Sequence, residues 1–134
     1  MPKEFPKPKD YSPFTKLLGL SYPVHKDGTA QATMELDERL LNNYETAHGG
    51  VIYSLADVAM GAAIWSTLDE DEICMTVEVK ITYLKPAISG TLVCDARVVN
   101  KTKRIGTLKA EVTNDGQVIA KTTGKFHISR IKVD

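Results

Sequence analysis

The sequence predicts an α+β fold in which an antiparallel sheet curls around one long, buried helix. Two features predict it: residues 49–68 are apolar on nearly every side at helical spacing, and four later segments alternate apolar and polar residues. A helix without a polar face has to be covered on most of its circumference, and a curled sheet is an economical cover. The 134 residues, 43% hydrophobic and 25% charged, suit one globular domain with a modest core.

Residues 1–13 are expected to form an extended, proline-rich arm, because proline fixes φ and lacks the N–H that helices and central strands need. This arm would act as a tether or a lid. Residues 14–134 are assigned to a single domain, whose first segment, residues 14–20, should form a short helical turn at best.

The first strand is predicted over residues 30–36, where small or apolar side chains alternate with polar ones after a turn at Asp27-Gly28. One face of this strand should be buried. Residues 37–47 then form a loop that leads into the central helix.

The central helix, expected to begin near Gly49, should be buried around its whole circumference. Asp57 is its one charged side chain, and the helix has no Lys or Arg that could pair with it. Burial of an unpaired carboxylate is unfavourable, so the pKa of Asp57 should be raised, which makes it a candidate catalytic base. Ser54 and Gly61 mark a place near it where another group can come close. The alternative is an aspartate that is solvated or satisfied by a polar partner.

Four more strands are predicted after an acidic turn at residues 69–72. The first of them ends at Lys85-Pro86 and should place its apolar residues on one face, namely Ile73, Met75, Val77, Val79, Ile81 and Tyr83. The others are expected over residues 92–99, 105–113 and 117–129, joined by turns at 89–90, 100–104 and 114–116. We expect an antiparallel meander whose far face or edge meets another subunit.

The basic residues are concentrated towards the C-terminus, although the net charge is zero. Residues 97–134 hold nine Lys or Arg and three Asp or Glu, so this half of the chain could receive an anion. The cations follow strand spacing and form no block of like charge. This pattern favours a solvated sheet face and argues against a nucleic-acid-binding arm.

Neither a disulfide framework nor a metal site is indicated. Cys74 and Cys94 form no CxxC pair, and the histidines at positions 25, 48 and 127 lack ligand spacing. The first residues lack the apolar core of a signal peptide, and no uninterrupted apolar run reaches the roughly 18 residues of a membrane span. We therefore expect a cytoplasmic protein with reduced thiols.

Three motifs stand in a fixed order along the chain: HGG at residues 48–50, LAD at residues 55–57 and ITYLKPA at residues 81–87. Asn42 precedes His48 by six residues. In this order and spacing the chain resembles the hotdog-fold acyl-CoA thioesterases of the phenylacetic-acid-degradation, or PaaI-like, type. The resemblance covers nearly the whole chain after the N-terminal arm, and it implies a hotdog fold.

The resemblance also implies roles for individual residues. It makes Asp57 the catalytic carboxylate and the Gly49 N–H the oxyanion donor, with Asn42 and His48 as polar positioning residues. Thr76 would supply a hydroxyl that helps to hold the water, although the alternation of its strand puts Thr76 on the polar face. No cofactor is implied, and the relatives form homodimers that commonly pair into homotetramers.

The chemistry is consistent with these roles. A thioester has an electrophilic carbonyl and a good leaving group, so its hydrolysis needs little beyond a base or nucleophile and a donor for the oxyanion. Unpaired N–H groups at a helix start can provide that donor, and the Gly49-Gly50 pair lets a carbonyl oxygen approach. The structural alternative is a tight helix entry that His48 caps.

The predicted function is hydrolysis of an acyl-CoA with an aromatic or medium-chain acyl group. Whether Asp57 attacks directly or activates water stays open. A hydratase or dehydratase of the same fold is less consistent with the sequence, because it would need a Glu where Ala62 stands. A non-catalytic acyl-CoA sensor is the other alternative. The CoA phosphates could bind some of the cations Lys101, Lys103, Arg104 and Arg130.

The spacing of Gly49 and Asp57 predicts an active site that two subunits share. The eight residues between them span about 12 Å of helix, too far for both groups to act on one carbonyl carbon. An antiparallel two-fold pairing of central helices would bring the start of one beside the middle of the other. We therefore expect a homodimer with two equivalent sites.

Overall fold

The computed structural model describes residues 12–21 and 23–131, so most of the predicted N-terminal arm lies outside the described residues. The elements follow the order α1 (Pro13–Leu18), β1 (Val24–Lys26), β2 (Thr29–Glu35), the 3-10 helix η1 (Glu38–Leu40), α2 (Gly49–Trp65), β3 (Glu72–Tyr83), β4 (Thr91–Lys101), β5 (Ile105–Asn114) and β6 (Gln117–Arg130). The strand β1 and the helix η1 were not predicted; both are only three residues long, too short to show a period.

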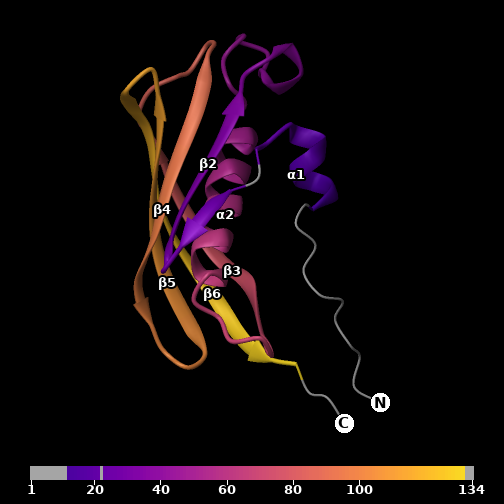
Figure 1. The fold of residues 1–134 in the computed structure, drawn as a ribbon. Coiled ribbons are helices and arrows are strands. Elements are labelled where there is room, and N and C mark those ends of the chain that lie inside the picture. The colour runs from indigo at the N-terminus through magenta and orange to yellow at the C-terminus, as the bar shows by residue number, and fades with distance from the viewer. Residues whose placement is uncertain (1–11, 22, 132–134) are drawn as a thin grey trace.

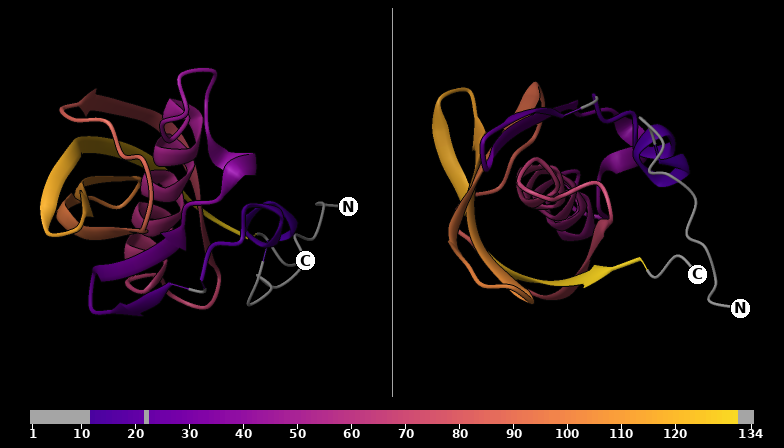
Figure 2. Two further views of the ribbon diagram at one scale, coloured as in Figure 1. Left: turned by 90° about the horizontal axis from the view of Figure 1, so that it is seen from above. Right: turned by 60° about the horizontal axis from the view of Figure 1, so that its bottom comes forward.

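The strands form one antiparallel sheet in the order β1-β2-β4-β5-β6-β3. The sheet curls around α2, which lies in its concave side (Figures 1 and 2). The predicted α+β arrangement is therefore confirmed. The meander comprises β4, β5 and β6, whereas β3 pairs with β6 at the opposite edge from β1. Because α2 connects β2 to β3, it carries the chain across the concave face from one side of the sheet to the other.

A β-bulge in β3 overturns the prediction that its apolar residues share one face. Thr76 pairs with Phe126 and Glu78 with Lys125, so Val77 is an extra residue with no partner opposite. Directly paired residues lie on the same face. Before the bulge the inward residues are therefore even-numbered, Cys74 and Thr76, opposite the buried Ile128 and Phe126.

After the bulge the inward residues of β3 are odd-numbered: Val79, Ile81 and Tyr83. The apolar residues before it face outward instead, and the side chains of Met75 and Val77 are 57% and 61% exposed. Strict alternation fails here because one extra residue shifts the pleat by one position. The bulge leaves an apolar strip on the outer side of an edge strand.

The sheet approaches α2 closely at two glycines. A Cβ built on Gly106 of β5 would collide with the Ile64 side chain, and one on Gly124 of β6 would lie 2.9 Å from Met60 Sδ. Both positions face inward, and both Ile64 and Met60 are fully buried. The absence of a side chain at both glycines therefore lets the sheet lie close to the helix. The larger helix residues Ile64 and Met60 fill the space above the glycines.

One stripe of α2 remains open in the single chain, so the prediction of burial on all sides holds only in part. The residues along this stripe repeat every three or four positions and are exposed or half-buried: Gly50, Tyr53, Ser54, Asp57, Val58, Gly61, Ala62 and Trp65. Six of these eight residues are glycine, serine, alanine, valine or aspartate, and five of the six lie within residues 54–62, which leaves room for a close neighbour. Within the described residues, no helix is long and apolar enough to cross a membrane.

Candidate active site

Asp57 lies at the centre of the open stripe on α2, where Thr76 of β3 reaches it. The Thr76 hydroxyl donates to Asp57 Oδ1 at 2.8 Å. Burial raises the pKa of Asp57 above its ordinary value, and the Thr76 hydrogen bond lowers it by a smaller amount. No cation of the described residues forms an ion pair with this carboxylate. Asp57 is thus a half-buried carboxyl with one neutral donor.

Thr76 reaches Asp57 because of the bulge. The sequence pattern placed Thr76 on the polar face of its strand, whereas the structure turns it towards the helix. Cys74, two residues earlier, points the same way, and burial together with the Asp57 charge raises the pKa of its thiol to about 11. Cys74 and the buried Cys94 are both free cysteines.

The start of α2 presents one unused backbone donor. His48 is the N-cap: its Nδ1 accepts from the Gly50 N–H at 2.9 Å, and its carbonyl accepts from Val51 and Ile52. The Gly49 N–H has no acceptor among the described residues. The first N–H groups of a helix carry partial positive charge and favour an anionic oxygen. His48 therefore caps the helix, and the Gly49 N–H is still available as a donor.

Tyr83, which sequence reasoning did not single out, holds the other side of Gly49. Its hydroxyl donates to the Gly49 carbonyl oxygen at 2.7 Å. The residue is the last of β3 and belongs to the ITYLKPA motif. Its inward direction, which the strand alternation gives after the bulge, could have suggested a contact with the helix start.

Asn42 organises the loop before the helix. Its side-chain Oδ1 accepts from the Tyr44 and Thr46 N–H groups at 2.9 and 3.2 Å, and its Nδ2 donates to Thr46 Oγ1 at 2.9 Å. The His48 N–H bonds to the Leu40 carbonyl on the other side of the loop. Within the single chain Asn42 thus shapes the loop that delivers His48 and Gly49 to the helix.

Gly49 and Asp57 stand at different levels of α2 (Gly49–Trp65), eight residues apart, which corresponds to about 12 Å of helix. The Gly49 N–H and the Asp57 carboxylate of one chain therefore do not converge on one carbonyl group. Each is nevertheless held by β3, through Tyr83 at the helix start and through Thr76 at its middle.

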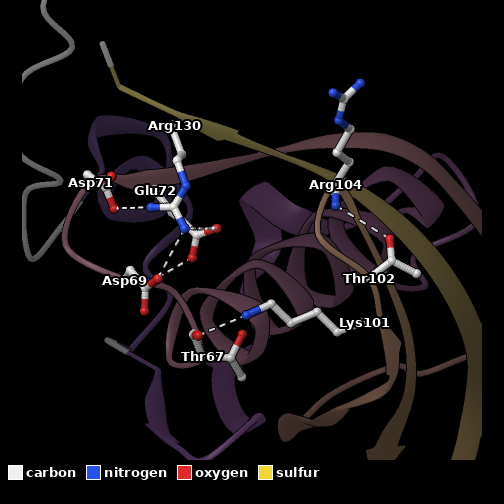
Figure 3. Close-up of polar contacts among 8 residues, drawn as sticks. All are labelled: Thr67, Asp69, Asp71, Glu72, Lys101, Thr102, Arg104 and Arg130. Carbon is white, nitrogen blue, oxygen red and sulfur yellow. Dashed lines mark hydrogen bonds and ion pairs between the residues drawn. The ribbon is translucent and has the colours of Figure 1, made fainter. Parts of the chain in front are cut away.

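The candidate phosphate ligands differ in their surroundings, as Figure 3 shows. Arg130 lies among carboxylates, 2.6 Å from Asp71 and 3.4 Å from Asp69. The Lys101 ammonium donates to the Thr67 carbonyl at 2.9 Å, just beyond the end of α2. The Arg104 guanidinium extends away from this group and has no ion pair within the described chain.

Lys103 and Arg104 lie in the turn between β4 and β5, at the C-terminal end of α2. Together with residues 127–130 and the Glu72 carboxylate they line a hollow of about 300 Å³. Neither Lys103 nor Arg104 takes part in an ion pair with a described residue. Two of the four candidate cations are therefore unneutralised, and two are occupied by groups of the chain itself.

Residues 44–121, more than half of the chain, match the thioesterase superfamily. The chain belongs to this superfamily. Among its relatives, a putative esterase of Archaeoglobus fulgidus is 37% identical over 104 residues, which make up 76% of this chain and 66% of the relative. The acyl-coenzyme A thioesterase PaaI of Escherichia coli is 32% identical over 114 residues, 84% of this chain and 79% of PaaI.

Solved structures of other proteins share the fold. A conserved protein from Pseudomonas aeruginosa superposes with a TM-score of 0.86 at 34% identity, over 90% of this chain and 96% of the other. The predicted membership of the hotdog-fold, PaaI-like thioesterases is confirmed. The prediction of a thioester hydrolase is confirmed, because a relative in this family is named an acyl-coenzyme A thioesterase.

Proposed function

We propose that this chain hydrolyses acyl-CoA thioesters to the free acid and CoA. The observation that carries the proposal is the Asp57 carboxyl, which lies half-buried on an apolar helix, has a raised pKa and has Thr76 as its one hydrogen-bond donor within the described residues. A structural carboxylate would have more donors or a cation. The 32% identity to a named acyl-coenzyme A thioesterase supports the choice of substrate class.

In the general-base route, Asp57 takes a proton from a water molecule while the water oxygen attacks the thioester carbonyl carbon. The carbonyl electrons move to oxygen, and the Gly49 N–H donates to the resulting oxyanion. The intermediate then collapses, the C–S bond breaks, and the CoA thiolate receives the proton from Asp57. In the nucleophilic route the carboxylate attacks first and water cleaves the anhydride; both routes give the same products.

His48 and Asn42 serve this reaction by fixing the donor. His48 binds the Gly50 N–H, which leaves the Gly49 N–H as the free donor of the helix start. Asn42 holds the turn that precedes His48. Thr76 orients the Asp57 carboxylate and leaves its second oxygen, Oδ2, for water.

The active site forms between two copies of the chain. Asp57 from one copy and Gly49 from the other meet when two α2 helices pair in opposite directions along their open stripes. The unpaired edge of β3, with the exposed Met75 and Val77, offers a second contact, since a long apolar edge strand tends to pair with another strand. The resemblance to PaaI-like enzymes further supports a tetramer of two such dimers.

The CoA phosphates bind at the turn between β4 and β5, mainly through Lys103 and Arg104. These two cations form no ion pair with described groups, and they line a hollow whose one carboxylate, Glu72, lies 4.0 Å from Arg130. Lys101 and Arg130 contribute less, because each is already bound within the chain. Two free cysteines fit a reducing compartment, so we place the reaction in the cytoplasm.

The test is release of free thiol from a panel of acyl-CoA esters with short, medium, long and aromatic acyl groups. We expect turnover of medium-chain or aromatic esters, without added metal or cofactor. Asp57→Asn should lower kcat by roughly 10²–10⁴-fold, the usual scale for general acid–base catalysis.

Asp95→Asn is the matched control, because Asp95 lies on β4 and bonds Gln31 at the sheet surface. It should retain wild-type turnover. Unchanged turnover in Asp57→Asn would remove Asp57 from the mechanism. A wild-type chain that binds acyl-CoA esters and releases no thiol would instead be the non-catalytic acyl-CoA sensor.

A further inference from the structure

Tyr83 contacts the residue that carries the oxyanion donor. Its hydroxyl donates to the Gly49 carbonyl oxygen at 2.7 Å, from the end of β3 to the start of α2. We infer that Tyr83 is a positioning residue that holds the Gly49 backbone in place at the helix start, and with it the Gly49 N–H that faces the substrate carbonyl. This inference rests on the proposed function, in which the Gly49 N–H binds the oxyanion.

Gly49 needs such a constraint because glycine alone does not fix its backbone direction. Without a Cβ it has a wide range of φ and ψ, and its own N–H has no acceptor among the described residues. The peptide group before it, which carries the Gly49 N–H, is held on its carbonyl side by the bonds of Val51 and Ile52 to the His48 carbonyl. The peptide group after it is fixed by Tyr83 on the carbonyl side and by His48 on the N–H side.

The Tyr83 ring also fills the space that a side chain at position 49 would take. A Cβ on Gly49 would lie 3.1 Å from the Tyr83 hydroxyl oxygen and 3.3 Å from Cζ. Both distances are shorter than ordinary carbon contacts, so the ring packs directly on the Gly49 backbone. The glycine and the tyrosine are therefore fitted to each other.

The hydroxyl remains a donor at working pH. Burial, and to a lesser extent the neighbouring Tyr53, raises the pKa of Tyr83 above its ordinary value, so the proton is retained at neutral and mildly alkaline pH. The same strand binds Asp57 through Thr76. β3 thus contacts both Asp57 and Gly49 of its own chain. In the proposed dimer these two residues belong to different active sites.

The test compares Tyr83→Phe with Tyr44→Phe. Tyr44 is a matched control, because its side chain is 80% exposed in the loop before His48 and makes no hydrogen bond within the described residues. Kinetics with the best acyl-CoA ester should show kcat/KM about five-fold lower in Tyr83→Phe, as expected for loss of one positioning hydrogen bond. Tyr44→Phe should match the wild type.

Two non-hydrolysable CoA analogues separate positioning from general structure. In a ketone analogue a methylene replaces the sulfur and the carbonyl remains, whereas in an S-alkyl-CoA a methylene replaces the carbonyl. Calorimetry should show that Tyr83→Phe binds the ketone about five-fold more weakly and the S-alkyl-CoA as tightly as wild type. Retained S-alkyl-CoA binding also shows that the variant is folded.

A double-mutant cycle adds a second measurement. Gly49→Ala brings a Cβ against the Tyr83 oxygen, and Tyr83→Phe removes that oxygen. The loss of turnover caused by Gly49→Ala should therefore be at least about two-fold smaller in the Tyr83→Phe background than in the wild type. Strict multiplication of the two losses would contradict a direct fit between the residues.

The outcomes distinguish this inference from the function on which it rests. If the wild type hydrolyses no acyl-CoA, both are wrong. If the wild type is active and Tyr83→Phe matches it in kcat/KM and in ketone binding, the role of Tyr83 is wrong and the proposed function stands. Equal weakening of the ketone and the S-alkyl-CoA would make Tyr83 a purely structural residue and would also overturn the inference.

Discussion

The Thr76 hydroxyl binds Asp57 Oδ1 at 2.8 Å, and this hydrogen bond joins β3 to the middle of α2. It opposes the effect of burial on the carboxyl, since a donor stabilises the charged form and desolvation destabilises it. Thr76 therefore affects both the direction of the carboxylate and the pH at which it ionises.

Thr76→Val should move the acidic limb of the pH–kcat/KM profile to higher pH. Burial already raises the pKa of Asp57, and Val removes the hydrogen bond that lowers it, so the base stays protonated to a higher pH. Thr76→Ser keeps a hydroxyl and should leave the limb near that of the wild type. Measurements of kcat/KM between about pH 4 and pH 8 give the shift. If the acidic limb of Thr76→Val lies at the same pH as in the wild type, or at a lower pH, the prediction is wrong.

Asp57→Asn should raise the thermal unfolding midpoint at neutral pH by a few degrees. The pKa of Asp57 is raised in the folded state above its value in the unfolded state. Its favourable contribution to the free energy of unfolding is therefore fully present below the unfolded-state pKa, and it is lost as pH rises through the folded-state pKa. At pH 7 the charge is unfavourable in the folded state, and Asn removes it while keeping the shape. The gain should shrink towards about pH 4, and Asp95→Asn should show no such gain.

Mixed dimers should test the shared active site. Asn42→Ala disrupts the loop on the side of the proposed donor, and Asp57→Asn removes the proposed base. When the two inactive variants are unfolded and refolded together, a mixed dimer has one site with both lesions and one site with neither. Random pairing should restore about a quarter of wild-type hydrolysis. If mass spectrometry finds mixed dimers and the mixture remains inactive, the site lies within one chain.

Lys103→Gln/Arg104→Gln should raise KM for acyl-CoA esters several-fold with little change in kcat, and KM should become less sensitive to salt. Arg97→Gln/Lys109→Gln is the control: these two residues form a directly opposed pair on the outer sheet face and make no ion pair with described residues. Arg130→Gln should leave KM near the wild-type value, because three carboxylates already surround Arg130. An equal rise of KM in the control would assign the effect to net charge.

The sequence predicted the start of the central helix and the bounds of most strands to within two residues, because each carries a clear period. The helix was expected near Gly49, where it begins, and the strand expected over residues 117–129 ends at Arg130. The unpaired Asp57 was also identified before its surroundings were known. These features depend on local pattern and on the chemistry of single residues.

Two features of the site could not be predicted, because they depend on pairing between distant strands. The bulge at Val77 appears only in the register of β3 against β6, and it decides that Thr76 faces Asp57. The contact of Tyr83 with Gly49 depends on the same register. The open stripe of α2 was missed for a different reason: small apolar residues such as Gly61 and Ala62 look the same in sequence whether a sheet or another helix covers them.

The two glycines beneath α2 have an evolutionary consequence. Gly106 and Gly124 leave the space that Ile64 and Met60 occupy, so each glycine and its large neighbour are parts of one packing solution. A relative with alanine at the position of Gly106 should therefore carry a smaller residue at the position of Ile64. Across an aligned family, positions 106 and 64 should covary, as should positions 124 and 60, although each pair joins the helix to a distant strand.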